Sequence, residues 1–515
     1  MLDFPRPTNT EPLPLAKLAD LLTGATNGGT TVEPDNLAAS LGGHATGISL
    51  AGHLVQRGDI YAALAGANRH GAEFSAQAIQ RGAVAILTDE RGAQLAAEDA
   101  AEAGIPLLLA TNPRALTGEI AARIWGRPSE HLNLIGITGT SGKTSVCYLI
   151  EAGLRHAGRT TGIIGTVETT IAGETIPSKR TTPEAPELQA LLAVALERGV
   201  TDVVMEVSSH ALTLGRVGGC RFAVAGYTMF GTDHLDFHRD LDEYFQAKAE
   251  LFDGRATVEI LNADDERVIS LAKPETVTYS LTDPRATWYA ASTAREGFDQ
   301  HFFVTGPEGT TEATLHMPGR HNMANALLAY ASLSAVGVPL DTATSGVASC
   351  PGVPGRMELV SGTAPVRGVV DYAHKPEAIS AVLDSLQETT PGRVIAILGA
   401  GGDRDASKRA LMGRAAAASA DLVMITDDNP RTEDPASIRA QVASAVQAVP
   451  CRNISGREVA VREAVAMAAP GDTIALLGKG HETTQELADR VIECDDRVLL
   501  ARALADAGWV TPAAV

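Results

Sequence analysis

Gly139-Thr140-Ser141-Gly142-Lys143-Thr144 is the stretch of sequence that decides the fold of this chain. An apolar run at residues 134–137 precedes it, and a helix-like run at residues 145–154 follows it. A strand, a glycine turn and a helix start in this order build a phosphate cradle, because free backbone N–H groups and the positive helix end face the anion. Lys143 is expected to reach the outer phosphates, and the Thr144 hydroxyl to ligate magnesium. The sequence therefore predicts a site for a nucleoside triphosphate.

The loop is a shortened variant of the usual phosphate-binding pattern. The strict pattern has a further glycine five residues before Gly142, where this chain has Ile137. An ordinary tight turn is the alternative reading of such a glycine cluster. The Lys-Thr pair that follows it, between strand and helix signals, favours phosphate binding over that alternative.

Length and composition bound the class of protein. A chain of 515 residues is too long for one core and suggests about three or four domains. The formal net charge of -20 disfavours nucleic acid and anionic membranes as partners. No leader-like start and no apolar run long enough to span a bilayer are found, so we expect a soluble cytoplasmic protein without membrane insertion. The five cysteines are scattered without paired spacings, which predicts reduced thiols rather than a zinc site or disulfides.

The chain divides into three α/β blocks, with predicted boundaries 1–128, 129–355 and 356–515. Prolines at positions 5, 7, 12 and 14 predict that the first residues form an extended arm. In the first block, short strands at 59–64, 84–87 and 106–109 alternate with a helical stretch at 74–81. The motif Trp-Gly-Arg-Pro at 125–128 is typical of a linker before the strand that feeds the phosphate loop.

The middle block is predicted to contain a parallel sheet with polar clusters at the strand ends. Apolar runs at 203–207 and 223–230 are typical of strands buried on both faces. Glu206 and His234 follow these runs, and ligands gather at the carboxyl ends of parallel strands, so both are candidates for the surroundings of the γ-phosphate. Taken singly, Glu206 is as compatible with a salt bridge or a helix cap. His234 is an unusual magnesium ligand, and a hydrogen-bonded polar histidine is the alternative.

The last block repeats the alternation, with apolar strands predicted at 368–371, 394–398, 422–426 and 473–477. The cluster Gly399-Ala400-Gly401-Gly402 resembles part of a dinucleotide fingerprint, but Arg404 occupies the position of the third glycine. A bulky arginine there disfavours NAD binding.

Ten ordered motifs together resemble the Mur ligases, and the resemblance runs from about residue 45 to about residue 485. They are the loop at 139–144, Thr181-Thr182-Pro183-Glu184, Glu206-Val-Ser-Ser-His210, Asp233-His-Leu-Asp236, Gly319-Arg-His-Asn322 with Asn325, Gly355-Arg356-Met-Glu358, Asp371-Tyr-Ala-His374, the segment 399–405, Asp428-Asn-Pro-Arg431 and Gly478-Lys-Gly-His-Glu482. The shortened phosphate loop is also a trait of this family.

The resemblance implies a small N-terminal domain that holds a UDP-sugar, a central ATPase domain and a C-terminal Rossmann-like domain that carries the incoming amino acid. Within the family the motifs are most similar to those of members that use ATP to add meso-2,6-diaminopimelate to UDP-N-acetylmuramoyl-L-alanyl-D-glutamate. The implied reaction is C–N bond formation through an acyl phosphate in peptidoglycan precursor synthesis, and hence in cell wall biogenesis, cell shape and division. The implied partners are these three small molecules and Mg²⁺, with the protein a monomer.

The resemblance also implies roles for individual residues, position by position. It implies catalytic roles for Lys143, Glu206, His234 and Lys248. It implies metal ligands at Thr144, Glu206, His234 and Lys248, with Lys248 carbamylated to N6-carboxylysine. ATP is implied to bind Gly139, Thr140, Ser141, Gly142, Lys143, Thr144, Ser145, Asn322, Asn325, Arg356 and Asp371. The UDP-muramoyl dipeptide is implied to bind Leu50, Thr181, Thr182, Ser208 and Arg216. Diaminopimelate is implied to bind Arg404, Asp428, Asn429, Pro430, Arg431, Gly478 and Glu482.

Each of these residues has an ordinary structural alternative. Without the resemblance Lys248 is a solvated lysine on a helical stretch that begins near Leu241, and the two asparagines are helix caps. Arg431 is the residue we expect to select diaminopimelate, because a guanidinium can grip its additional carboxylate through two parallel hydrogen bonds. Its alternative is a solvated turn residue after Pro430.

The chain departs from the family pattern at two places. Residues 49–53 read Ser-Leu-Ala-Gly-His where many members have an Asp-Ser-Arg uridine motif, and Met229 stands where asparagine is common. Other functions remain alternatives: a P-loop kinase or motor ATPase, a catalytically idle nucleotide-binding scaffold, the lysine-adding ligase of the same family, or a folylpolyglutamate synthetase-like ligase. A kinase or motor needs a conventional Walker loop, and an idle scaffold should have lost Lys143, Glu206 or Lys248.

Overall fold

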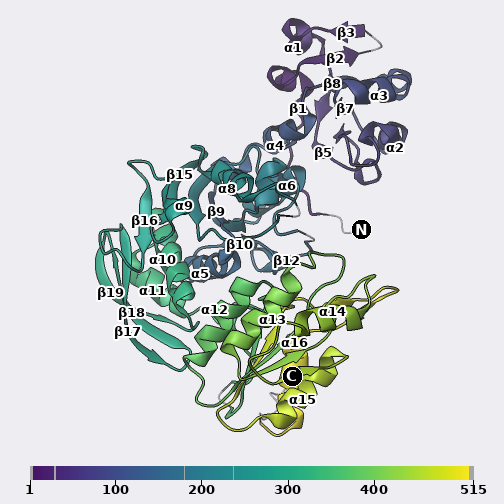
Figure 1. Cartoon of the computed structure of the whole chain (residues 1–515). Coiled ribbons are helices and arrows are strands. Elements are labelled where there is room, and N and C mark those ends of the chain that lie inside the picture. Colours follow the sequence, from purple (N-terminus) through teal and green to yellow (C-terminus); the bar gives the residue numbers. More distant parts are fainter. Residues whose placement is uncertain (1–3, 28–29, 179, 236, 363, 510–515) are drawn as a thin grey trace. The chain divides into compact units, whose positions relative to one another are not determined.

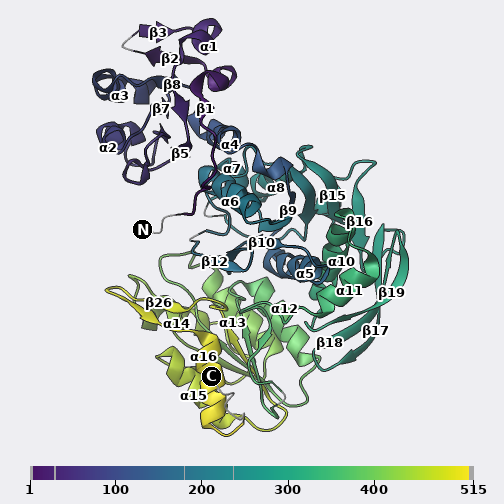
Figure 2. The same ribbon diagram turned by 180° about the vertical axis from the view of Figure 1, so that it is seen from behind.

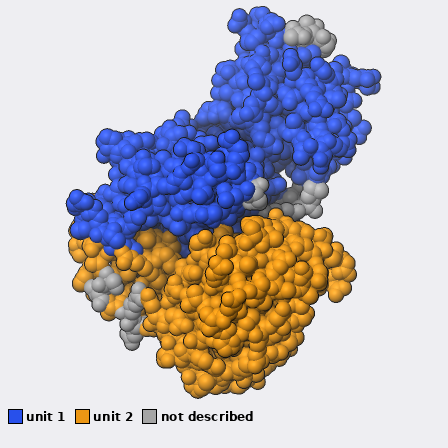
Figure 3. Space-filling view, in the orientation of Figure 1, with its two compact units in different colours: residues 1–288, 328–346 blue, residues 289–327, 347–515 orange. Residues whose placement is uncertain are grey.

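The computed structural model describes residues 4–27, 30–178, 180–235, 237–362 and 364–509. The chain forms two compact units, coloured blue and orange in Figure 3. Unit 1 contains residues 1–288 and 328–346, and unit 2 contains residues 289–327 and 347–515. The three-domain division at 128/129 and 355/356 stays a prediction.

Unit 1 begins with a small α/β sheet whose strands lie in the order β3-β2-β8-β7-β6-β5 (Figure 1). Strands β5 to β8 pair in parallel, and β2 and β3 add antiparallel pairing at one edge. The strands are β2 (Gly24–Asn27), β3 (Thr30–Val32), β5 (Gly47–Ser49), β6 (Asp59–Ala62), β7 (Ala85–Thr88) and β8 (Leu107–Leu109), and the longer helices are α2 (Ser75–Gln80), α3 (Glu90–Ala103) and α4 (Pro113–Ile124). The three strands and the helix predicted here are confirmed, with boundaries shifted by up to two residues.

The segments before and after this sheet are packed against it. The predicted extended arm is confirmed, since residues 4–12 form no helix and β1 (Leu13–Pro14) pairs with β4 (His44–Ala45). The predicted linker is a tight turn, with positive φ at Gly126 and Arg127. Trp125 is nonetheless buried in the apolar core of the sheet, because α4 ends only one residue earlier. The linker is therefore part of the packed structure.

The second sheet of unit 1 carries the phosphate loop. Its strands in unit 1 lie in the order β12-β11-β10-β13-β9-β14-β15-β16. They are β9 (Asn133–Thr138), β10 (Thr161–Ile164), β11 (Thr169–Ile171), β12 (Glu174–Ile176), β13 (Asp202–Glu206), β14 (Phe222–Tyr227), β15 (Ala256–Asn262) and β16 (Val277–Ser280). The predicted parallel sheet is confirmed from β10 to β16, whereas β11 and β12 extend it antiparallel at one edge. The predicted strand at 223–230 ends three residues early, at Tyr227.

Helices cover this sheet because their apolar positions match it. They are α5 (Lys143–His156), α6 (Ala185–Glu197), α7 (Ser209–Thr213) and α8 (Leu241–Ala249). Leu188, Leu191 and Leu192 of α6 pack with Leu134 and Val203 of the strands in one apolar cluster. Burial of each such side chain contributes about 1.5–3 kcal/mol to folding. This packing fixes the strand ends that bear the candidate site.

Unit 2 contains a sheet in the order β20-β21-β25-β22-β23-β24, in which β21, β25, β22, β23 and β24 are parallel. The strands are β20 (Glu358–Leu359), β21 (Arg367–Asp371), β22 (Val394–Leu398), β23 (Leu422–Ile425), β24 (Cys451–Asn453) and β25 (Thr473–Leu477). The helices around it are α12 (Pro376–Gln387), α13 (Lys408–Ser419), α14 (Pro435–Ala443), α15 (Arg457–Met467) and α16 (Asp496–Asp506). The four strands predicted here are confirmed.

Unit 2 has two further features. A hairpin of β26 (Thr484–Glu486) and β27 (Val491–Glu493) follows β25; β26 is labelled in Figure 2. Strands β17 (Trp288–Glu296), β18 (Asp299–Gly306) and β19 (Gly309–Leu315) form an antiparallel meander that the sequence analysis did not predict. The helices α10 (Arg320–Ala335) and α11 (Leu340–Ala348) follow this meander, and their residues 328–335 and 340–346 belong to unit 1. No described helix combines the length and the apolar character needed to cross a membrane.

Candidate functional site

The phosphate loop connects β9 to α5 through two glycines with positive φ, Gly139 at +139° and Gly142 at +88°. A Cβ atom on Gly139 would lie 1.8 Å from Oγ1 of Thr228, so the backbone approach and the torsion both require glycine. The Thr228 hydroxyl donates to the carbonyl of Ser141 at 2.6 Å, which fixes the loop to the end of β14. Thr144 and Ser145 lie buried in the first turn of α5. The predicted loop residues therefore form one turn at a helix N-terminus, the geometry that binds phosphate.

The carboxylate of Glu206, at the end of β13, is the centre of a buried hydrogen-bond network. Only 1% of the residue is exposed. Oε1 accepts the Thr144 hydroxyl at 3.0 Å and the backbone N–H of Thr166 at 2.8 Å, and Oε2 accepts the Thr166 hydroxyl at 3.1 Å. Gly165 is required beside it, since a Cβ there would lie 2.7 Å from Oε1. The phosphate loop and the segment after β10 thus share one carboxylate.

The network continues to the threonine motif. The hydroxyls of Thr166 and Thr181 lie 2.9 Å apart, within hydrogen-bond distance. The Thr182 hydroxyl donates to the backbone carbonyl of Glu206 at 2.8 Å, and it accepts the N–H of Ser208 at 3.2 Å. The Ser208 side chain caps α7. Three residues predicted to bind the muramoyl dipeptide are therefore joined by hydrogen bonds to the residues predicted to bind ATP and metal.

Two lysine ammonium groups converge on the carbonyl of Gly139. Lys143 donates to it at 2.7 Å and Lys248 at 2.9 Å. Lys248, on α8, is 1% exposed, and its Nζ lies 4.7 Å from the centre of the Tyr244 ring. The Tyr244 hydroxyl donates to Oγ1 of Thr140 at 3.2 Å, so α8 is attached to the phosphate loop through two side chains. The solvated lysine that the residue pattern alone suggested is therefore not what the structure places at 248.

His234 belongs to an aromatic cluster next to these residues. Its Nε2 lies 3.0 Å from Oδ2 of Asp233, and its ring centre lies 4.7 Å from that of His210 and 5.9 Å from that of Tyr244. Its φ of +53° places a non-glycine residue in the left-handed region, where strain is common at functional sites. Asp236, the last residue of this motif, lies outside the described residues. His234 shares Tyr244 with Lys248, which links it to the loop.

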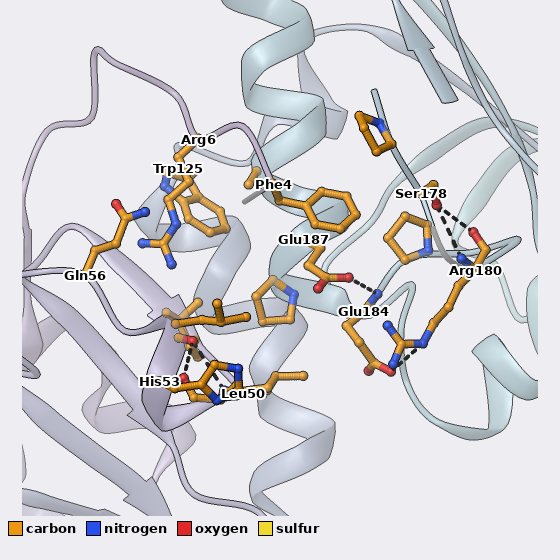
Figure 4. Close-up of a pocket in the computed structure, with 18 of the residues that line it drawn as sticks. Phe4, Arg6, Leu50, His53, Gln56, Trp125, Ser178, Arg180, Glu184 and Glu187 are labelled. Carbon is orange, nitrogen blue, oxygen red and sulfur yellow. Dashed lines mark hydrogen bonds and ion pairs between the residues drawn. The ribbon is translucent and has the colours of Figure 1, made fainter. Parts of the chain in front are cut away.

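A cavity of about 380 Å³ lies within unit 1. Figure 4 shows its walls, with Leu50 and His53 on one side and Ser178 and Arg180 on another. Leu50 is predicted to bind the UDP-sugar, and segment 180–184 contains Thr181 and Thr182. The cavity and the hydrogen-bond network are therefore built in part from the same stretch of chain.

Glu184 organises three arginines at this end of the cavity. Its carboxylate lies 2.9 Å from Arg216, 3.6 Å from Arg114 and 3.7 Å from Arg180, measured between the nearest nitrogen and oxygen atoms. Nε of Arg216 is buried without a hydrogen-bond partner among the described residues. Burial raises the pKa of Glu187, whose carboxylate accepts the Glu184 N–H. The three arginines carry more positive charge than the single Glu184 carboxylate that they surround can balance. This end of the cavity therefore suits an anionic ligand.

In unit 2 most of the residues predicted to bind the amino acid meet where β22, β23 and β25 end. The Asn429 amide donates to Oε2 of Glu482 at 3.0 Å, and Gly478 has a φ of +113° with room for no side chain beside Asp428. Lys479, which is fully buried, donates to Glu482 at 3.2 Å and to the Thr484 carbonyl at 2.5 Å. The sequence motif at 478–482 contains Lys479, but no separate role was predicted for this residue. The fixed spacing from Gly478 to Glu482 was the signal that could have identified it.

Arg431 lies in this cluster with its guanidinium already engaged. Nε lies 2.6 Å from Oε2 of Glu486 on β26, and Nη1 donates to the carbonyl of Gly402 at 2.8 Å. Its φ of +51° is in the left-handed region, and Pro430 before it is buried. The solvated-turn alternative is therefore wrong in part, because Arg431 is ion-paired and three-quarters buried. Arg404 is exposed on the loop that follows Gly402.

The remaining residues predicted to bind ATP also lie in unit 2. Asn322 donates to the Pro318 carbonyl at 2.8 Å and accepts from Asn325 at 3.1 Å, and both are buried in the first turns of α10. The guanidinium of Arg356 lies 4.3 Å from the centre of the Tyr372 ring. Asp371 accepts the N–H groups of Met357 and Ala373, both at 2.7 Å, and burial raises its pKa.

A magnesium ion fits the donors of the phosphate loop only in part. Thr144 and Glu206 supply a hydroxyl and a carboxylate oxygen 3.0 Å apart, which are the hard ligands that Mg²⁺ prefers. Among the described residues no cluster of three or more His, Cys, Asp or Glu side chains has metal-binding geometry. Mg²⁺ usually keeps several waters and is bound through phosphates rather than in an all-protein cage, so this sparse donor set suits a nucleotide-borne metal.

Comparisons with known proteins identify the family of the chain. Family models match residues 44–125 (Mur ligase family, catalytic domain), 137–333 (Mur ligase middle domain) and 355–480 (Mur ligase, glutamate ligase domain). The chain is 47% identical over 512 residues to UDP-N-acetylmuramoyl-L-alanyl-D-glutamate–2,6-diaminopimelate ligase of Streptomyces coelicolor, covering 97% of this chain and 98% of that protein. This chain belongs to the Mur ligase family. It is accordingly an ATP-dependent ligase.

Other Mur ligases support the same assignment. The ligase of the same name from Corynebacterium glutamicum is 43% identical over 464 residues, covering 87% of this chain and 89% of that one. A solved structure of a ligase with this name has a TM-score of 0.66 at 30% identity and covers 90% of this chain and 96% of its own. Folylpolyglutamate synthase of Mycobacterium tuberculosis, with a TM-score of 0.58 at 19% identity over 76% of this chain and 94% of its own, shares the fold alone.

Replacing Glu206 by glutamine tests the network directly. The change keeps the shape but removes the charge that holds the Thr144 and Thr166 hydroxyls, so we expect ATP turnover to fall about 10²-fold or more. Substrate-dependent ADP release measures the effect. Glu174→Gln, at an exposed edge strand where the described ion pair of Glu174 is with Arg198, is the matched control. Wild-type turnover in Glu206→Gln would show that the carboxylate has a purely structural role.

Proposed function

We propose that this Mur ligase adds meso-2,6-diaminopimelate to UDP-N-acetylmuramoyl-L-alanyl-D-glutamate, with conversion of ATP to ADP and phosphate, in peptidoglycan precursor synthesis. The names of the relatives at 43–47% identity support the substrate pair. The proposal includes a monomeric cytoplasmic enzyme whose partners are these three small molecules.

The observation that carries the proposal is the network around Glu206. Phosphoryl transfer to a carboxylate requires the γ-phosphate and the acceptor to lie together. Thr144 belongs to the phosphate loop, whereas Thr181 and Thr182 belong to the segment proposed to hold the dipeptide. All three reach Glu206 directly or through one threonine hydroxyl.

The chemistry follows from the poor reactivity of a free carboxylate. An oxygen of the D-glutamate side-chain carboxylate attacks the γ-phosphorus, the bond from phosphorus to the β,γ-bridging oxygen breaks, and ADP leaves. The amine of diaminopimelate then attacks the acyl phosphate carbon, and phosphate leaves as the amide forms and the amine loses a proton. Lys143 is positioned to stabilise charge on the transferring phosphoryl group. Bound Mg²⁺ would supply further charge stabilisation, with Thr144, Glu206 and His234 as the proposed protein ligands.

Lys248 is proposed to be carbamylated. Its neutral amine would form an N–C bond with CO₂ and release a proton, which converts a cation into a carboxylate-like donor. The support is its position: Nζ is buried beside the phosphate loop and shares the Gly139 carbonyl with Lys143. The conversion leaves Lys143 as the one cation at that carbonyl and adds an oxygen ligand of the kind that Mg²⁺ prefers.

The amino acid is proposed to bind among the residues that surround Asn429 in unit 2: Arg404, Asp428, Asn429, Pro430, Arg431, Gly478 and Glu482. Diaminopimelate differs from lysine by a second carboxylate, which Arg431 can hold with two hydrogen bonds. Asn322, Asn325, Arg356 and Asp371 are proposed to contact the nucleotide. Both oxygens of Asp371 also accept backbone N–H groups, so Asp371 in addition holds the loop that carries Arg356.

The reaction itself is tested by phosphate release with purified protein, ATP and the UDP-muramoyl dipeptide. We expect turnover with meso-diaminopimelate to exceed turnover with L-lysine by about a hundredfold or more, because lysine lacks the second carboxylate and forfeits the charge-assisted hydrogen bonds proposed for Arg431. The lengthened peptide product is identified by mass spectrometry. Preference for lysine would favour the lysine-adding ligase, and phosphate release only with folate and glutamate would favour the folylpolyglutamate synthetase alternative.

Arg431→Ala is expected to raise the KM for diaminopimelate by about tenfold to a hundredfold, because a charge-assisted hydrogen-bonding partner of the substrate is lost. The KM for ATP should change little. Arg490→Ala, which removes an exposed arginine beside the β26–β27 hairpin, is the matched control. Equal effects of Arg431→Ala on both KM values would contradict a role in amino-acid selection.

Lys248→Ala is expected to abolish turnover, and acetate is expected to restore part of it by supplying the missing carboxylate. Lys143→Ala should be equally inactive but unresponsive to acetate, since Lys143 is proposed to act as a cation. In the wild type, ¹³C-labelled bicarbonate should give a carbamate signal that is absent from Lys248→Ala. A nucleotide complex with an unmodified amine at Lys248 would overturn the modification.

A further inference from the structure

The N-terminal arm is held at three points within unit 1. The Phe4 side chain packs against the apolar cluster of the second sheet. Nη1 of Arg6 donates to Oδ1 of Asp59 on β6 at 2.6 Å. The N–H groups of Thr8 and Asn9 donate to the carboxylate of Glu197, at the end of α6, at 3.0 and 2.7 Å. The arm is therefore fixed to both sheets of the unit.

The fixed arm contributes two side chains to the wall of the cavity. Phe4 and Arg6 both line it, together with Leu50, His53 and Glu187; Figure 4 shows Arg6 next to Trp125 and Phe4 next to Glu187. The match to the family models begins at residue 44, so the arm lies outside the part of the chain that those models describe. The contacts of the arm are therefore the evidence for its role.

The counter-charges distinguish Arg6 from the other cations of the cavity. Arg114 and Arg180 are paired with Glu184, which itself lines the cavity. The partner of Arg6 is Asp59, which is 1% exposed and is not part of the lining. The Arg6 guanidinium therefore lines the cavity, whereas the carboxylate that balances its charge, Asp59, is buried outside the lining.

The pair with Asp59 also orients the guanidinium. Asp59 is held in turn by the N–H of Gln56 at 2.8 Å, and Gly47 leaves the space that the pair needs, since a Cβ there would lie 2.3 Å from Oδ1 of Asp59 and 2.7 Å from Nη1 of Arg6. The Arg6 guanidinium makes one hydrogen bond to the described residues, and its acceptor is Asp59. Its remaining N–H groups are thus available as a planar fork, the geometry that suits phosphate oxygens.

We propose that Arg6 binds the diphosphate of the UDP-muramoyl substrate, with Phe4 forming an apolar wall of the same site. The inference rests on the proposed function for the identity of the sugar nucleotide. It adds to that function a binding element from the extreme N-terminal part of the chain. It requires only a nucleoside diphosphate in the cavity, so it is tested separately from amide formation.

Arg6→Gln is compared with the wild type by calorimetric titration of the full-length protein with the UDP-muramoyl dipeptide, UDP and uridine. Loss of a charge-assisted contact should weaken binding of both diphosphates by about tenfold to a hundredfold. Uridine, which has no phosphate, should bind to the two proteins alike. Arg6→Lys, which keeps the charge but not the fork, should lie between them.

Three further variants separate ligand binding from arm anchoring. Arg91→Gln, at an exposed arginine of α3, should bind all three ligands like the wild type. Glu197→Gln and Phe4→Ala loosen the arm without changing its charge, so any loss they cause should be equal for UDP and uridine. An equal loss in Arg6→Gln, or undiminished UDP binding, would overturn the proposal. A wild type that binds UDP but makes no amide would refute the proposed function, and the comparison of UDP with uridine would still decide the role of Arg6.

Discussion

The rest of unit 1 depends on the need to satisfy the buried carboxylate of Glu206. A charge at the end of a strand, removed from water, is tolerated only when donors surround it. Here the donors come from the phosphate loop, through Thr144, and from the segment after β10, through Thr166. One unfavourable burial therefore fixes the distance between the groups proposed to hold the triphosphate and the groups proposed to hold the acceptor.

In unit 2 buried cations, rather than a buried carboxylate, are surrounded by hydrogen-bonding partners from several segments. Arg457 pairs with Asp496, both at most 2% exposed, and it also donates to the carbonyls of Asp427 and Leu477 at 3.3 and 2.9 Å. These carbonyls lie at the ends of β23 and β25, directly before Asp428 and Gly478. Lys479 adds a second buried cation that holds Glu482 and the start of β26. Removing one partner of such a pair leaves an unpaired charge, which costs about 3–5 kcal/mol, so these pairs hold together the strand ends that carry the proposed amino-acid site.

The parts that the sequence predicted are those with local signals. The strand at 394–398 is an uninterrupted apolar run, and the strand at 473–477 is apolar after its first threonine. The phosphate loop is marked by glycines whose positive φ no other residue adopts cheaply. Contacts between distant segments left no such signal. Thr166 lies 40 residues from Glu206 in the sequence, and only folding brings the two side chains together. Arg6 and Asp59 are likewise 53 residues apart in the sequence. The meander β17–β19 was missed because its polar, alternating strands lack the apolar runs that identified the parallel sheets.

The burial of the central groups follows from the chemistry of the ligase. An acyl phosphate is hydrolysed wherever water reaches it, so the groups around it must be dry. Glu206 and Lys248 are each 1% exposed, and in such surroundings every charge needs a designated partner. The Gly139 carbonyl shows how this is met: two ammonium groups meet on one neutral acceptor, beside a helix N-terminus that adds further positive potential. The phosphates of a nucleotide together with a carbamate on Lys248 would place negative charge beside these two groups.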